Sequence, residues 1–119
     1  MAQLTLEASS RTNDSETVRI EAVIERSKVQ ASAPEQVMGG PTLAQYCASA
    51  TSPDGFSFTV CEYPSADQAT RGAAEAKLVR GGMSGWQVKT RKKSVLELVV
   101  RSDAKQESVQ AVIGAFESM

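Results

Sequence analysis

Apolar and polar residues alternate along two segments, within residues 43–63, that flank the sequence Ser52-Pro53-Asp54-Gly55. Pro53 suits the second position of a type I turn because its ring presets φ, and Gly55 suits the left-handed position that follows. A three-residue loop with a bulge at the glycine is a common way to close a hairpin. The pattern therefore predicts a β-hairpin in which Ser52 pairs with Phe56.

This register places Cys47 opposite Cys61, at a site where the two residues exchange no backbone hydrogen bonds. The α-carbons of such a pair approach to about 4.5 Å, at the short end of what a disulfide tolerates. We predict a disulfide that staples the hairpin; the alternatives are a redox-sensitive pair or two free thiols. Strand alternation puts the cysteines on the more polar face, and the core face then comprises Ala48, Ala50, Phe56, Phe58 and Val60.

Sequence patterns before and after the central hairpin predict further strands and a helix. Alternation over residues 3–8 and 17–25 predicts an N-terminal β-hairpin, followed by a connector over 27–42 with a short helical turn at 33–38. Ser65 and Gln68 match a capping box, which predicts a helix to about Arg80 closed by Gly81-Gly82. Its predicted inward face comprises Ala69, Ala73, Ala76 and Val79.

A second hairpin is predicted from residues 86–90 and 95–100, turning through 91–94. Residues 95–100 are apolar on both faces for part of their length, which favours an interior strand. Asp103 with Gln106 offers a further capping box. A helical stripe follows, formed by Val109, Val112, Ile113 and Phe116.

From residue 43 the predicted order is β-β-α-β-β-α, which is a ferredoxin-like sandwich with its last strand moved to the front. We therefore predict an α+β fold: an antiparallel sheet with two helices packed on one face, preceded by the N-terminal hairpin. With 119 residues, the chain is expected to form one domain, residues 1–119. No apolar run approaches the roughly 20 residues of a membrane helix, so we expect a small soluble domain without a membrane span.

Formal charge is distributed unevenly along the chain. Residues 1–76 carry 5 basic and 10 acidic side chains, and residues 77–105 carry 8 basic and 2 acidic ones. A local basic patch can attract anionic partners. The candidate anion-binding residues are Lys89, Arg91, Lys92, Lys93 and Arg101. The alternative is a charged hairpin tip that only keeps the protein in solution.

Candidate catalytic chemistry is sparse. The chain has no histidine, which removes the commonest general base, the Ser-His and Cys-His nucleophiles and most catalytic zinc sites. The cysteines do not form a Cys-x-x-Cys motif. Gly81-Gly82-Met83-Ser84-Gly85 lacks the spacing of a nucleophile elbow or of a phosphate-binding loop. We accordingly predict no catalytic residue, no metal and no cofactor; a carboxylate pair drawn from residues such as Glu21, Glu25 and Glu62 is the enzymatic alternative.

Two segments share the same order of predicted elements. Residues 56–77, FSFTVCEYPSADQATRGAAEAK, and residues 99–116, VVRSDAKQESVQAVIGAF, each lead from a strand into a helix. This repeated order of a strand and a helix resembles the sporulation-related repeat domain, a family that binds peptidoglycan glycan strands. The valine-glycine strand ending of that family is absent here, and no residue role is carried over from it.

Taken together, the sequence predicts a non-enzymatic binding or accessory domain with a protein or glycan partner. Nucleic-acid binding is disfavoured, because an RNA-recognition sheet needs exposed aromatic platforms and Phe56 and Phe58 are assigned to the core. A disulfide implies an oxidising compartment, so we expect a periplasmic or extracellular protein of the bacterial cell envelope; free cysteines would fit the cytoplasm.

Overall fold

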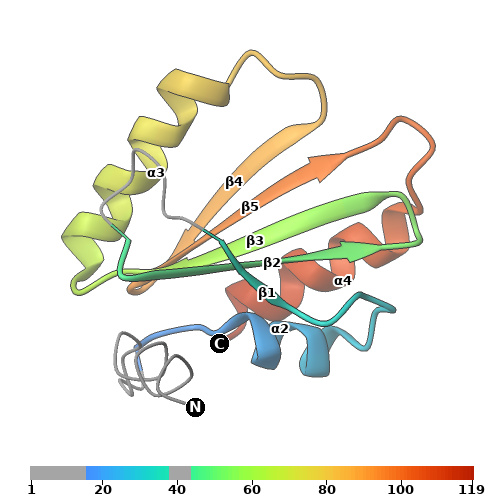
Figure 1. Ribbon diagram of the computed structural model, residues 1–119, viewed down its shortest axis with the longest axis horizontal. Helices are drawn as coiled ribbons and strands as arrows, with labels where there is room; N and C mark the ends of the chain where they lie inside the picture. Colours follow the sequence, from blue (N-terminus) through green and yellow to red (C-terminus); the bar gives the residue numbers. More distant parts are fainter. Residues whose placement is uncertain (1–15, 38–43) are drawn as a thin grey trace.

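The computed structural model describes residues 16–37 and 44–119 (Figure 1). Five antiparallel strands form one sheet in the order β1-β2-β3-β5-β4. Three helices complete the described part of the chain, so the predicted α+β class and antiparallel sheet are confirmed. In chain order the elements are α2 (Ile20–Ser27), β1 (Glu35–Val37), β2 (Tyr46–Ser52), β3 (Phe56–Glu62), α3 (Ala66–Arg80), β4 (Trp86–Arg91), β5 (Ser94–Val100) and α4 (Gln106–Glu117).

The central hairpin has the predicted register. Ser52 pairs with Phe56, and Gly55 takes the left-handed conformation with a φ of 95°. The turn is closed by a hydrogen bond of 3.2 Å from the Gly55 amide to the Ser52 carbonyl. Strand β3 pairs with β2 on one side and β5 on the other, so it lies at the centre of the sheet.

One face of the sheet packs against α2 and α4; in Figure 1, α4 passes behind the strands and α2 lies below them. As predicted, Phe56 and Phe58 point into this core, and their rings stack with centroids 5.8 Å apart. The predicted stripe of α4 is buried as well. The main side chains of this core are Ala48, Ala50, Val60, Leu96 and Leu98 from the strands, Ile20 and Val23 from α2, and Val109, Val112, Ile113 and Phe116 from α4.

Helix α3 lies on the opposite face of the sheet, so the prediction of two helices on one face is wrong. It packs on a second cluster made with Cys47, Cys61 and Val95, whose side chains alternate with those of the main core. Cys47, Cys61 and Val95 make this end of the polar face apolar, so it can support a helix of small residues. Ala69, Ala73 and Ala76 are buried as predicted, whereas Val79 is 62% exposed.

The predicted N-terminal β-hairpin is wrong for its second strand, because α2 occupies residues 20–27. Its apolar residues fit both a strand and a helix, since Ile20, Val23 and Ile24 share one helical face. The core against α4 selects the helix. Ser94 of β5 fixes its start: the Ser94 hydroxyl accepts a 2.8 Å hydrogen bond from the Val18 amide and donates one of 2.9 Å to the Val18 carbonyl. The predicted strand at 3–8 lies outside the described residues.

Two local predictions also fail. Residues 35–37 form the edge strand β1 rather than a helical turn, because they extend the sheet beside β2. Asp103 does not cap α4: its carboxylate pairs with Arg101 at 2.9 Å, and the helix begins after Lys105 without a side-chain cap. By contrast, Ser65 caps α3 as predicted, accepting a 3.1 Å hydrogen bond from the Gln68 amide.

Candidate functional site

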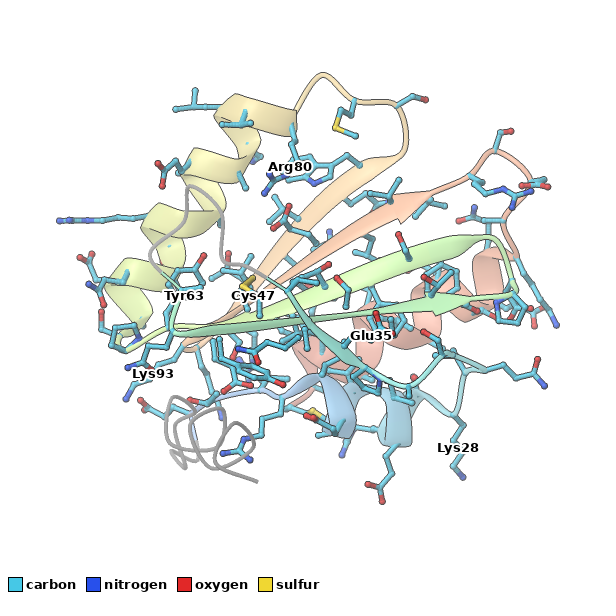
Figure 2. All side chains as sticks on the ribbon, in the orientation of Figure 1. Lys28, Glu35, Cys47, Tyr63, Arg80 and Lys93 are labelled. Atoms are coloured by element: carbon cyan, nitrogen blue, oxygen red, sulfur yellow. A yellow bond between two sulfur atoms is a disulfide. The ribbon has the colours of Figure 1, made fainter. Side chains whose placement is uncertain are left out.

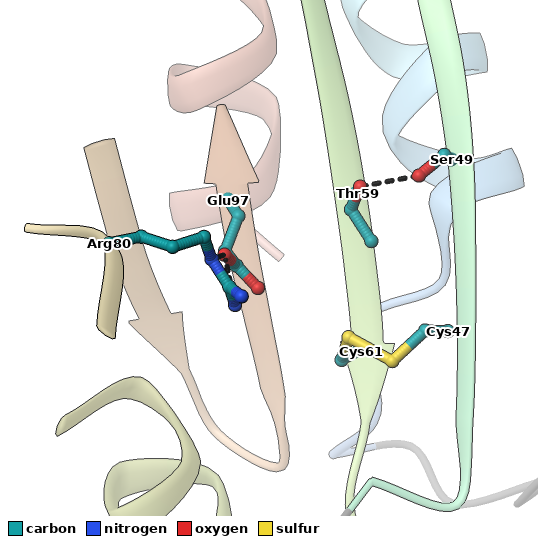
Figure 3. Close-up of a disulfide and its surroundings, with 6 residues drawn as sticks. All are labelled: Cys47, Ser49, Thr59, Cys61, Arg80 and Glu97. Carbon is teal, nitrogen blue, oxygen red and sulfur yellow. Dashed lines mark hydrogen bonds and ion pairs between the residues drawn. A yellow bond between two sulfur atoms is a disulfide. The ribbon is translucent and has the colours of Figure 1, made fainter. Parts of the chain in front are cut away.

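The site is organised by the disulfide between Cys47 and Cys61, which is present as predicted (Figure 3). The Cα atoms of the two residues are 4.1 Å apart. The Tyr63 amide donates to the Lys93 carbonyl at 2.8 Å, so odd-numbered residues of β3 bond to β5. Cys61 therefore faces Cys47 at a non-hydrogen-bonded site, which is the geometry that the sequence predicts.

Helix α3 covers the disulfide end of this face and leaves the other end of the sheet without a helix (Figure 1). Tyr63 fills the space beneath the helix, where Gly72 allows a close approach: a β-carbon on Gly72 would lie 2.5 Å from Cζ and 2.8 Å from Cε2 of Tyr63. Figure 2 shows Cys47 and Tyr63 near the first half of α3 and Arg80 towards its other end. The helix thus stops where the sheet becomes polar.

We call this second region the uncovered face. Cross-strand pairing places on it Glu35, Ser49, Thr51, Ser57, Thr59, Trp86, Glu97 and Val99. In the middle of this face, a 2.5 Å hydrogen bond between the hydroxyl groups of Ser49 and Thr59 connects β2 to β3 (Figure 3). The uncovered face is therefore a polar surface of hydroxyl groups with two carboxylates, those of Glu35 and Glu97, one valine and one tryptophan.

A single carboxylate, that of Glu97, joins the uncovered face to the end of α3. Its Oε1 accepts hydrogen bonds from Arg80 Nε at 2.9 Å and from Trp86 Nε1 at 3.1 Å. The Arg80 Nη2 atom completes the ion pair at 2.8 Å, and the Glu97 side chain is only 14% exposed. This half-buried pair is screened less than a surface ion pair, so it holds the helix end and the tryptophan in place.

At the turn end, the uncovered face contains a shallow hollow of about 210 Å³. Its lining combines hydroxyls, one arginine and apolar surface, from Thr51, Ser52, Gly55, Phe56, Ser57, Val99 and Arg101. Val99 is 41% exposed, and Met83 in the loop between α3 and β4 is also exposed. Contiguous apolar surface that is rimmed by polar residues is typical of protein-contacting regions.

The five candidate anion-binding residues do not form one patch. Arg91, Lys92 and Lys93 lie at the β4–β5 turn. Lys89 lies two residues before Arg91, on the core side of β4, where it pairs with Leu96. Arg101 follows the far end of β5 and pairs with Asp103. Lys93 lies 3.8 Å from the carboxylate of Glu16, and Arg91 donates to the Met119 carbonyl at 3.4 Å.

The carboxylates that could form an enzymatic pair are also separated. Glu62 is buried on the core side of β3, whereas Glu97 lies on the opposite face of the sheet. Glu21 and Glu25 lie exposed on α2. Over residues 16–37 and 44–119, no group of three side chains has the composition and proximity of a metal site. No helix of this part of the chain is long and apolar enough to cross a bilayer.

Comparison with protein families, with curated proteins and with solved structures finds no match for this chain. The similarity to the sporulation-related repeat domain is limited to the repeated order of a strand and a helix in the sequence.

The cluster of Arg80, Trp86 and Glu97 was not predicted from the sequence. Its members come from a helix end and two strands, and nothing in their spacing brings them together. One signal was present: Glu97 is the single charge in the apolar run of residues 95–100. A carboxylate in an interior strand requires partners, and the partners are the residues that complete the cluster.

Proposed function

We propose that the protein is a non-enzymatic binding domain of the cell envelope that contacts a protein partner through its uncovered face. The observation that carries this proposal is the sharp limit of α3: one end of the sheet face is covered by a helix, and the other presents Ser57, Thr59 and Val99 to solvent. An antiparallel sheet can leave one face in water when the side chains on that face are polar. The uncovered face departs from this pattern at Val99, which is 41% exposed among the hydroxyl groups.

The composition of the surface supports a protein partner over a small substrate. The hollow of about 210 Å³ is smaller than the usual ligand pocket, which measures roughly 300–1,000 Å³. The exposed apolar side chain of Val99 suits an interface that buries about 800 Å² on each partner. Neutral hydroxyls around it can exchange hydrogen bonds without a large desolvation cost.

The disulfide supports the cell envelope as the location. Disulfides persist in oxidising compartments such as a periplasm or the cell exterior and are rare in the cytosol. In this fold the disulfide between Cys47 and Cys61 also connects β2 and β3, the two strands that supply most hydroxyl groups of the uncovered face. A cross-link there would keep the binding surface ordered before the partner arrives, which reduces the entropic cost of association.

The proposal is tested by Thr51→Arg, with Gln110→Arg as the matched control. Both side chains are exposed; Thr51 lies on the uncovered face, and Gln110 lies on α4, on the other side of the sheet. The tagged full chain is used to retain envelope proteins from the cells that produce it. We expect Thr51→Arg to weaken retention of the partner by at least about tenfold, because a bulky charge would be buried against the partner without a counter-charge. Gln110→Arg should retain it as the unmodified chain does. Equal retention by both variants would exclude the uncovered face.

A further inference from the structure

The outer edge of strand β4 has free backbone groups in a defined register. The Val100 amide donates to the Gly85 carbonyl at 2.9 Å, so hydrogen bonds to β5 come from Gly85, Gln87, Lys89 and Arg91. The amides and carbonyls of Val88 and Thr90 therefore point away from the sheet. Within the described residues, no backbone hydrogen bond connects them to another element.

Beside this edge, α3 and β4 enclose a groove of about 260 Å³. The helix runs alongside β4 in Figure 1, and the groove is open to solvent between them. Its walls are short side chains and one lysine: Thr70, Ala73, Ala74, Lys77, Val88 and Thr90. A strand paired with β4 would direct every second side chain into this groove, where small or branched apolar residues fit.

Charge is the third feature of this edge. Lys77 lies on the groove side and Lys89 on the core side of β4, while Lys92 is exposed at the turn that ends the strand. Over residues 16–37 and 44–119, none of these three lysines takes part in an ion pair. None of the residues that line the groove is acidic. The edge therefore presents uncompensated positive charge on both sides of its free backbone groups.

We propose that the edge of β4 binds an extended acidic segment of a partner protein, which adds to the sheet as a sixth strand. Main-chain bonds to Val88 and Thr90 would supply the pairing, and the α3 groove would select the residues on one side of the segment. Acidic residues on the other side would meet Lys89. A second copy of this chain fits poorly, because pairing two β4 edges would bring their lysines together. This surface is separate from the uncovered face, so either proposal can fail alone.

The probe is the blocked peptide acetyl-Glu-Val-Glu-Val-Glu-Val-Glu-amide, titrated into the isotope-labelled full chain. Amide resonances of β4, those of Val88 and Thr90 above all, are expected to shift, and the affinity should fall as salt is added. The matched peptide with lysine in place of every glutamate should not bind at about 1 mM. Absence of shifts with the acidic peptide, or equal binding of the two peptides, would overturn the proposal.

Thr90→Pro separates strand addition from simple charge attraction. Proline at this position removes an amide that points outward and none that bonds to β5, so the sheet should persist. Loss of that donor is expected to weaken peptide binding by about tenfold. Thr90→Val keeps the amide and should bind within about twofold of the unmodified chain, since no backbone bond is lost.

Unchanged affinity in folded Thr90→Pro would overturn the proposal. If that variant does not fold, hydrogen exchange of the unmodified chain decides: the acidic peptide should slow exchange at the Val88 and Thr90 amides. Unaltered exchange at both amides would overturn it equally.

Discussion

Replacing both cysteines, by Cys47→Ala with Cys61→Ala, is expected to lower the free energy of unfolding by about 3 kcal/mol. The bond closes a loop with a sequence separation of 14, and opening it restores conformational freedom to the unfolded chain. The two cysteines also form the floor on which Ala69 and Ala73 of α3 pack, so the variant loses apolar contacts in the folded state. Urea unfolding followed by circular dichroism measures the change.

Reducing agent provides the matched control for this prediction. It should destabilise the unmodified protein by a similar amount and leave the double alanine variant unchanged, because that variant has no disulfide to reduce. A loss below about 1 kcal/mol in the unmodified protein would contradict the view that the bond stabilises the hairpin.

Gly72→Ala is expected to destabilise the protein by about 2 to 3 kcal/mol, although alanine is the better helix former. Its methyl group would lie 2.5 Å from Cζ of Tyr63, a side chain that is 1% exposed and has little room to move. Either the ring shifts or α3 lifts from the sheet. Thermal and urea unfolding give the size of the loss.

Gly114→Ala in α4 is the matched control, since nothing lies within 4 Å of the added methyl group. It should stabilise the protein by about 0.5 to 1 kcal/mol through helix propensity alone. Tyr63→Leu should also reduce the penalty of Gly72→Ala in the double variant. Equal effects of the two alanine substitutions would show that Gly72 does not mark a close contact.

The sequence predicts the features that depend on local chemistry. Pro53 and Gly55 determine the turn, and the turn then fixes which residues face each other across the hairpin, including Cys47 and Cys61. Ser65 determines where α3 begins. In each case a side chain or a φ angle acts on residues only a few positions away, so a single sequence is sufficient.

Features that depend on distant packing are not predictable in this way. Alternation over residues 17–25 favours a strand, yet packing against α4 makes residues 20–27 a helix. Helix α3 packs on the face where Cys47, Cys61 and Val95 form an apolar surface, although its alanines could pack on either side. The polar cluster at Glu97 depends in turn on the position of α3, because Arg80 reaches Glu97 only when the helix lies on that face of the sheet.

Photo-crosslinking tests most directly whether the uncovered face contacts a partner, with p-benzoylphenylalanine placed at Val99, exposed at the turn end of that face, or at Gln110 on α4. The full chain is expressed and irradiated in the cells that produce it. We expect a discrete adduct from position 99 that disappears in the Thr51→Arg background, and none from position 110. Adducts from position 110 alone, or an adduct from position 99 that Thr51→Arg leaves unchanged, would contradict the proposal.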